Sequence, residues 1–272
     1  MNQLKFILAN CKYGQKNPGV ELGSKILFNQ LQRKDPFIKQ KLVTTIKNSY
    51  FKDMLGYKFL YDTSKQLLTQ HHKVITLGGD HSISMGSVPA FFDIFREQGT
   101  LLWIDAHPDI NTPETSTTGN LHGMSVASIF NLMKPVINSN YKPSFDQLIY
   151  IGLRSIDPPE QLFLDTNNIL YFDNKTIQEK GMEHVIDVIM KKTKKNIHVS
   201  FDIDSLDPSI TPATGTPVEN GLELLETINL IENLEEKRLV RSVDFVEYNP
   251  YMYDAEKVTV QNCMKILNLF IK

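Results

Sequence analysis

The chain has 272 residues, of which 41% are hydrophobic and 22% are charged, as in a globular protein with a sizeable core. Its 29 Lys and Arg residues nearly balance its 31 Asp and Glu residues, and the resulting net charge of -2 argues against a nucleic-acid partner. No apolar run approaches the ~18 residues of a membrane-spanning helix. The spacing of the two cysteines, Cys11 and Cys263, indicates neither a disulfide framework nor a thiolate zinc site. We therefore expect a cytoplasmic protein with no membrane partner.

Short β-rich runs alternate with helical patterns along the whole chain. Strands are expected at residues 5–10, 42–47, 73–78, 100–106, 147–153, 168–172, 196–204 and 241–247, and helices at 21–32, 59–72, 84–98, 182–195, 222–236 and 254–272. Alternation of this kind is typical of a parallel sheet whose strands are joined by helices. Since no linker, repeat or change of composition interrupts the pattern, we expect one α/β domain over residues 1–272, with a mostly parallel sheet and helices on both faces.

Polar residues interrupt the apolar pattern at the carboxyl ends of predicted strands. The motifs "GGDHS" (78–82), "DAHPD" (105–109), "DIDSLDP" (202–208) and "FVEYNP" (245–250) end or follow such strands, and two long loops rich in Gly, Pro and Thr start there. Open parallel sheets bind ligands at this edge, and loops of this length are more typical of function than of simple connection. The sequence therefore predicts a functional site at the carboxyl edge of the sheet.

Six side chains in these motifs are candidate metal ligands: His81, Asp105, His107, Asp109, Asp202 and Asp204. Residues i and i+2 of an extended chain point the same way, so Asp105 and His107 share one side, as do the two carboxylates of "DID". Each motif alone is more typical of a turn or a helix cap. Together they place at least four carboxylates within a few ångströms, which is unfavourable without cations. Oxygen-rich ligation with a minority of imidazole favours manganese or magnesium, and the number of ligands favours two ions about 3.5–4 Å apart.

The same motifs resemble those of the ureohydrolases and, within them, the arginase family. The resemblance covers nearly the whole chain in the family's order: "GQKNPGVELG" (14–23), "GGDHS", "DAHPDINTPETSTTGNLHG" (105–123), "IGLRSIDPPE" (151–160), "SFDIDSLDPSITPATGTPVENGL" (200–222) and "VEYNP" (246–250). The loop "NTPETSTTGNLHG" favours arginase over other ureohydrolases. The resemblance implies a three-layer α/β sandwich around a mostly parallel eight-stranded sheet, of the arginase/deacetylase type.

The resemblance also implies two Mn²⁺ ions per chain and hydrolysis of L-arginine to L-ornithine and urea, by attack of a metal-bridging hydroxide on the guanidinium carbon. Carried over by position, one ion is held by His81, Asp105, Asp109 and Asp202, and the other by Asp105, His107, Asp202 and Asp204. Asp105 and Asp202 are then the bridging ligands. By the same analogy we expect a homo-oligomer, a trimer.

The other candidate residues suit the chemistry of that reaction. Glu247 can hold the guanidinium cation by paired charge-assisted hydrogen bonds. Asp109 can accept a hydrogen bond from the nucleophile, and His122 can give a proton to the leaving amine. Hydroxyl donors in the loop at 111–120 suit the substrate α-carboxylate, and the acidic residues of "IDPPE" suit its α-ammonium. The threonine of "GTPV" either positions the guanidinium or only packs its loop. The predicted substrate-binding residues are Asn111, Ser116, Thr118, Asn120, Asp157, Glu160 and Thr216.

Some features leave alternatives open. Ser155 stands where many arginases have an acidic residue, and Thr118 stands where serine is common. The chain stops at its last helix, without the tail that some members use in trimer contacts. One alternative is another ureohydrolase, such as an agmatinase or a guanidino-acid hydrolase, which would keep the metals and differ in the pocket for the substrate tail. The second alternative is an inactive family member that acts as an amino-acid sensor or an assembly subunit. All six ligand positions are intact, which favours an active enzyme. No role is expected for His71, His72, His184 and His198.

Overall fold

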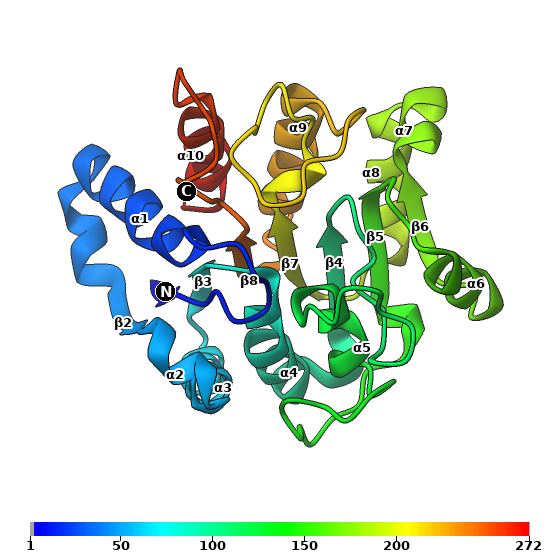
Figure 1. Cartoon of the computed structure of the whole chain (residues 1–272), viewed down its shortest axis with the longest axis horizontal. Coiled ribbons are helices and arrows are strands. Elements are labelled where there is room, and N and C mark those ends of the chain that lie inside the picture. The colour runs from blue at the N-terminus through cyan, green and yellow to red at the C-terminus, as the bar shows by residue number, and fades with distance from the viewer. Residues whose placement is uncertain (1–2, 272) are drawn as a thin grey trace.

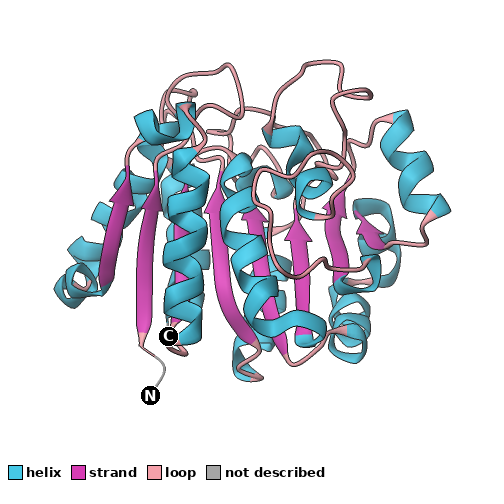
Figure 2. Ribbon diagram, turned by 90° about the horizontal axis from the view of Figure 1, so that it is seen from below, coloured by secondary structure: helices cyan, strands magenta, loops and turns pink. Residues whose placement is uncertain are grey.

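A sheet of eight strands runs through the computed structural model, which describes residues 3–271. The strands are β1 (Leu4–Ala9), β2 (Leu42–Ile46), β3 (Lys73–Gly78), β4 (Gly99–Ile104), β5 (Leu148–Leu153), β6 (Leu170–Asp173), β7 (Asn196–Asp202) and β8 (Val240–Val246). They lie in the order β2-β1-β3-β8-β7-β4-β5-β6, and every neighbouring pair is parallel. In Figure 2 the strand arrows therefore point to one edge of the sheet, and the long loops gather beyond it.

Helices cover both faces of the sheet and complete three layers (Figure 1). One face is covered by α1 (Gly23–Lys34), α8 (Met182–Lys192), α9 (Leu224–Glu236) and α10 (Val258–Ile271), and the other by α3 (Leu55–Thr69), α4 (Ser84–Phe95) and α5 (Ser125–Ile129). Successive strand residues point to opposite faces, so Phe6 and Leu8 pack into the first core and Ile7 into the second. The predicted three-layer α/β fold is confirmed. No helix within residues 3–271 is long and apolar enough to cross a lipid bilayer.

Four short helices were not predicted from the hydrophobic pattern: α2 (Asn48–Lys52), α5, α6 (Pro158–Thr166) and α7 (Asn174–Lys180). Such helices are too short for a hydrophobic period to be read, so local capping signals matter more. α6 begins with a capping box, in which the Glu160 carboxylate accepts from the backbone amide of Asp157 at 3.0 Å. At the start of α7, the Asp173 carboxylate accepts from the amide of Thr176 at 2.7 Å. The segment "DPPE", which was assigned to substrate binding, therefore also starts a helix.

Candidate metal centre and active site

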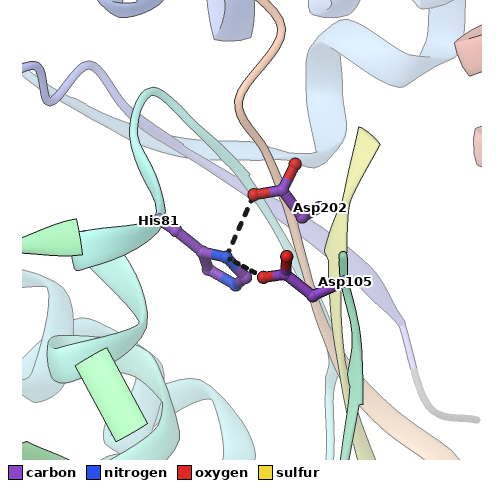
Figure 3. A group of neighbouring side chains, drawn as sticks. All are labelled: His81, Asp105 and Asp202. Carbon is purple, nitrogen blue, oxygen red and sulfur yellow. Dashed lines mark ion pairs between the residues drawn. The ribbon is translucent and has the colours of Figure 1, made fainter. Parts of the chain in front are cut away.

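Four predicted metal ligands converge at the carboxyl edge of the sheet. His81 lies shortly after β3, Asp105 directly follows β4, and Asp202 is the last residue of β7. The Nδ1 atom of His81 lies 3.0 Å from Oδ2 of Asp105 and 3.2 Å from Oδ2 of Asp202. Dashed lines mark these two contacts in Figure 3. Oδ2 of Asp109 lies 3.3 Å from the same nitrogen. Ligand atoms of His81, Asp105 and Asp202 all lie within 4.8 Å of one another, so one cation can contact all three.

A second group of ligands shares Asp105 with the first. The Nδ1 atom of His107 lies 3.4 Å from Oδ1 of Asp105 and 3.2 Å from Oδ2 of Asp204. Ligand atoms of these three residues again lie within 4.8 Å of one another. Asp105 thus directs one carboxylate oxygen to each group, as a ligand that bridges two ions would.

The two i, i+2 pairs come together in tight turns, so the extended geometry expected for them was wrong. β4 ends before Asp105, and the chain after Asp202 forms a 3₁₀ turn. Oδ1 of Asp105 accepts from the backbone amide of His107 at 2.7 Å, and Oδ1 of Asp202 accepts from that of Asp204 at 2.8 Å. Short Asp side chains favour such bonds to the amide two residues on. The turn brings each pair together and directs Oδ2 of Asp105 and of Asp202 toward Nδ1 of His81.

Contacts on several sides fix the position of His81. Its ring stacks on the indole of Trp103, with ring centroids 4.0 Å apart, and the indole nitrogen donates to Oδ2 of Asp105 at 3.0 Å. In the preceding turn, a Cβ atom at Gly79 would lie 1.8 Å from the carbonyl oxygen of Cys11. Only glycine permits this approach of two backbone segments, which explains why "GGDHS" needs a glycine there.

The cluster concentrates buried negative charge. Burial raises the pKa of Asp109 and of Asp202, and neighbouring carboxylates raise both pKa values further. Burial lowers the pKa of His81, but the adjacent carboxylate of Asp105 outweighs burial and raises that pKa to about 9. The buried Nδ1 atom of His81 has no hydrogen-bond partner among the described residues. A divalent cation would satisfy this nitrogen and the crowded carboxylates together, so the residues fit a metal centre.

A cavity of about 120 Å³ adjoins the two ligand groups. It is lined by most of the predicted substrate-binding residues, namely Asn111, Ser116, Thr118, Asp157, Glu160 and Thr216. Asn120 is not among the lining residues, whereas Thr117, Gly123 and Ser155 are. Of the residues that the structure describes, acidic ones line the cavity and neither Lys nor Arg does. Such a lining favours a cationic ligand.

Several lining side chains already hydrogen-bond to one another. Asn111 donates to Asp157 at 2.9 Å, and Thr216 donates to Oδ2 of the ligand Asp204 at 2.8 Å. Glu160 accepts from the amide of Ile110 at 3.1 Å, and burial raises its pKa to about 7. The hydroxyls of Ser116 and Thr118 accept from backbone amides of their own loop at 3.1 and 3.2 Å. Each of these two hydroxyls keeps its own hydrogen for a ligand.

Glu247 lies beside the centre, although it is not among the residues that line the cavity. Its Oε1 atom accepts from the backbone amide of His81 at 2.8 Å and lies 3.1 Å from Nδ1 of His122. Its Oε2 atom accepts from the side-chain amide of Gln15 at 2.7 Å. Gln15 was not predicted from the sequence, because nothing in "GQKNPG" indicates a partner 232 residues later. Glu247 therefore joins the first ligand group to His122 and to the opening loop.

Arg154 is a second residue of the site that was not predicted from the sequence. Its guanidinium donates to the carbonyl oxygens of Asp204 at 2.6 Å, Ser205 at 3.0 Å and Val218 at 2.7 Å. These bonds fix both ends of the long loop that carries Thr216. The arginine of "IGLR" could have been predicted to have a structural role, because a cation next to a buried strand needs several acceptors.

Comparison with known proteins identifies the family of this chain. A model of the Arginase family matches residues 4–271. The chain belongs to the arginase family. Membership confirms the resemblance seen in the sequence and the prediction that the chain is a hydrolase of this family.

Individual members of the arginase family show how far the similarity extends. Arginase of Entamoeba histolytica is 32% identical over 288 residues, which cover 98% of this chain and 96% of that protein. The crystal structure of Entamoeba histolytica arginase in complex with L-ornithine matches with a TM-score of 0.89 at 31% identity, over 99% of this chain and 98% of that chain. Mitochondrial arginase-2 of Bos taurus is 38% identical over 203 residues, which cover 68% of this chain and 55% of that protein.

Proposed function

We propose that this chain is a single catalytic domain that uses two Mn²⁺ ions to hydrolyse L-arginine to L-ornithine and urea. The observation that carries the proposal is the pair of buried ligand groups that share Asp105, next to an acid-lined cavity. The guanidinium and α-ammonium groups of arginine are both cations, which this lining favours. The relative from Entamoeba histolytica, which was crystallised with L-ornithine, supports the choice of product.

The six predicted ligands would divide between the two ions. One ion would be held by His81, Asp105, Asp109 and Asp202, and the other by Asp105, His107, Asp202 and Asp204. Carboxylates with a minority of imidazole suit Mn²⁺. When bound, two such ions lower the pKa of a water molecule enough for it to attack near neutral pH.

Glu247 is proposed to hold the substrate guanidinium through charge-assisted hydrogen bonds. Its Oε2 atom accepts one hydrogen bond, from Gln15, and keeps a second lone pair, so a guanidinium N–H can bind there without disturbing the contacts of Oε1 with His81 and His122. Asp109 and Glu247 have positive φ values of 51° and 68°. Such a backbone is strained for residues other than glycine and recurs at functional sites. The strain supports a role for both carboxylates in the reaction.

His122 is proposed to protonate the leaving amine. It lines the cavity, and its Nδ1 atom lies 3.1 Å from Oε1 of Glu247. Burial lowers the pKa of His122, but the hydrogen bond to Glu247 outweighs burial and raises that pKa above its usual value. A protonated imidazole is then available near neutral pH, with Nε2 as the atom that gives the proton.

His122→Asn is expected to lower kcat about a hundredfold, the lower end of the usual effect of removing a general acid. Mn²⁺ content should not change, because His122 belongs to neither ligand group. Steady-state kinetics and elemental analysis of the same preparation check both expectations. His184→Asn, on the exposed surface of α8, is the matched control. Loss of manganese from His122→Asn would show that His122 supports the metals and does not serve as a proton donor.

The proposed activity is tested by product release from L-arginine before and after metal removal. We expect urea and ornithine in equal amounts, loss of activity on chelation, and better restoration by Mn²⁺ than by Mg²⁺ or Zn²⁺. A folded protein that releases no urea after Mn²⁺ is restored would contradict the proposal.

The chain is further proposed to form a homotrimer in the cytoplasm. The trimer rests on family analogy. The location is supported by the free and buried Cys11 and Cys263, which a reducing compartment favours. Sedimentation equilibrium should give three times the 31.1 kDa of one chain, and a stable, active monomer would overturn the trimer. Cell fractionation that finds the protein outside the cytoplasm would overturn the location.

A further inference from the structure

Four buried polar side chains lie side by side on β7 and β8, on the face covered by α4. Ser200 is paired in register with Asp244, and His198 is paired with Ser242. All four are buried, and three of them have no exposed surface. Buried polar groups are unfavourable unless they bond to one another. Neither the ligand groups nor the proposed substrate contacts use any of these four residues.

A continuous series of contacts joins the metal ligand His81 to Asp244. The Nε2 atom of His81 lies 2.8 Å from Oγ of Ser200. Oγ of Ser200 lies 3.1 Å from Oγ of Ser84, the first residue of α4. The hydroxyl of Ser84 then donates to Oδ2 of Asp244 at 2.7 Å. None of these side chains is exposed, so bulk water does not compete for the bonds.

The carboxylate at the far end fixes the direction of every bond in this series. An ionised Asp244 only accepts, and each serine has a single hydrogen to give. Ser84 uses its hydrogen for Asp244 and must therefore accept from Ser200. Ser200 uses its hydrogen for Ser84 and must therefore accept from His81. His81 therefore donates from Nε2, so Nδ1 is the nitrogen that gives up its hydrogen to a metal ion and then presents its lone pair among the carboxylates of the first ligand group.

We propose that Asp244 is a positioning residue that orients His81 for metal binding through this one-way series of hydroxyl groups. The inference rests on the proposed two-ion centre and adds to it a group three hydrogen bonds away from the metal-binding nitrogen. Partners of this kind fix which nitrogen of a metal-binding histidine carries the hydrogen.

Ser87 provides an internal control for the proposal. Its hydroxyl also donates to Oδ2 of Asp244, yet no hydrogen bond joins it to Ser200 among the described residues. Ser84→Ala and Ser87→Ala therefore remove the same kind of bond to the same carboxylate. Only Ser84→Ala interrupts the series that ends at His81.

The experiment measures Mn²⁺ dissociation constants by titration of metal-free wild type and both variants, together with the thermal unfolding of the metal-free proteins. We expect Ser84→Ala to weaken the binding of one of the two ions about tenfold, the lower end of the effect of outer partners on metal affinity. Ser87→Ala should keep the wild-type dissociation constants. Metal-free Ser84→Ala should unfold at a somewhat lower temperature than metal-free Ser87→Ala, because it loses the bond from Ser200 as well as one bond to Asp244. The dissociation constants are therefore compared at a temperature at which both metal-free variants are folded. If Ser84→Ala does not fold, Ser84→Cys makes the same comparison, because a thiol of similar size is a weak donor.

Two results would overturn the inference while leaving the two-ion centre intact: equal weakening of Mn²⁺ binding in both variants, or wild-type affinity in Ser84→Ala. A folded wild-type protein that binds no Mn²⁺ would overturn the proposed centre and this inference with it. The dissociation constants of the wild type therefore separate the two failures.

Discussion

Asp202→Ala is expected to remove both metal ions and to lower kcat about a thousandfold or more. Asp202 belongs to the first ligand group and is a proposed bridge to the second, so its loss loosens both sites at once. Two metal ions stabilise the charges of the reaction by several kcal/mol, and each 1.36 kcal/mol corresponds to a factor of ten in rate. Kinetics with L-arginine and elemental analysis of the purified variant check the two expectations.

The same substitution should leave the metal-free protein folded. Burial and neighbouring carboxylates raise the pKa of Asp202, so removing it relieves repulsion in the absence of metal. Thermal unfolding of metal-free wild type and variant should therefore give similar midpoints, whereas added Mn²⁺ should stabilise the wild type alone. Asp187→Ala, on the exposed face of α8, controls for the loss of an aspartate. A variant that retains both ions, or that loses activity only because it unfolds, would contradict the bridging role.

L-Arginine is expected to be a far better substrate than agmatine, by about a hundredfold to several thousandfold in kcat/KM. Ser116 and Thr118 line the cavity with hydroxyl hydrogens free for a ligand. Agmatine has no α-carboxylate and would forfeit charge-assisted hydrogen bonds worth roughly 1.5–3 kcal/mol each. Urea release from each substrate at equal enzyme concentration gives the ratio. Comparable kcat/KM values would refute the arginase activity and leave another ureohydrolase activity in its place.

A double variant shows whether this loop is the source of the preference. Ser116→Ala combined with Thr118→Val should lower kcat/KM for L-arginine and leave that for agmatine unchanged. Thr115→Val is an unsuitable control, because Thr115 bonds to Asn111 within the loop. Thr117→Val is suitable, because Thr117 lines the same cavity and has no assigned role. An equal loss with both substrates would indicate that the double variant only disturbs the loop.

The alternation of strands and helices could be predicted from the sequence because it depends on the local pattern of apolar residues. The strands follow from short apolar runs, which the central strands bury along nearly their whole length, and the long helices from apolar residues that recur with a period of 3.6. The strand order β2-β1-β3-β8-β7-β4-β5-β6 does not, because it depends on packing between distant segments. α6 was missed although Asp157 and Glu160 form its capping box, since both carboxylates had been assigned to the substrate. A single carboxylate can both cap a helix and bind a substrate.

The metal ligands could be predicted because His and Asp side chains bind metals directly and their spacing is visible in the sequence. Their geometry could not, since Asp105 and Asp202 close tight turns with their own backbone where an extended chain was expected. Two residues that contact the site only through other side chains were missed for a different reason. Gln15 and Asp244 acquire their roles only from contacts between distant segments, with Glu247 and Ser84 respectively. Such contacts leave no local pattern in a single sequence.

The number of Mn²⁺ ions bound per chain at full activity tests the two-ion account most directly. Metal-free protein is titrated with Mn²⁺ while bound metal and urea release from L-arginine are measured on the same samples. We predict that activity rises until two ions are bound per chain and does not increase further, because ligand groups that share Asp105 act together. Full activity with one ion or none bound per chain would contradict it.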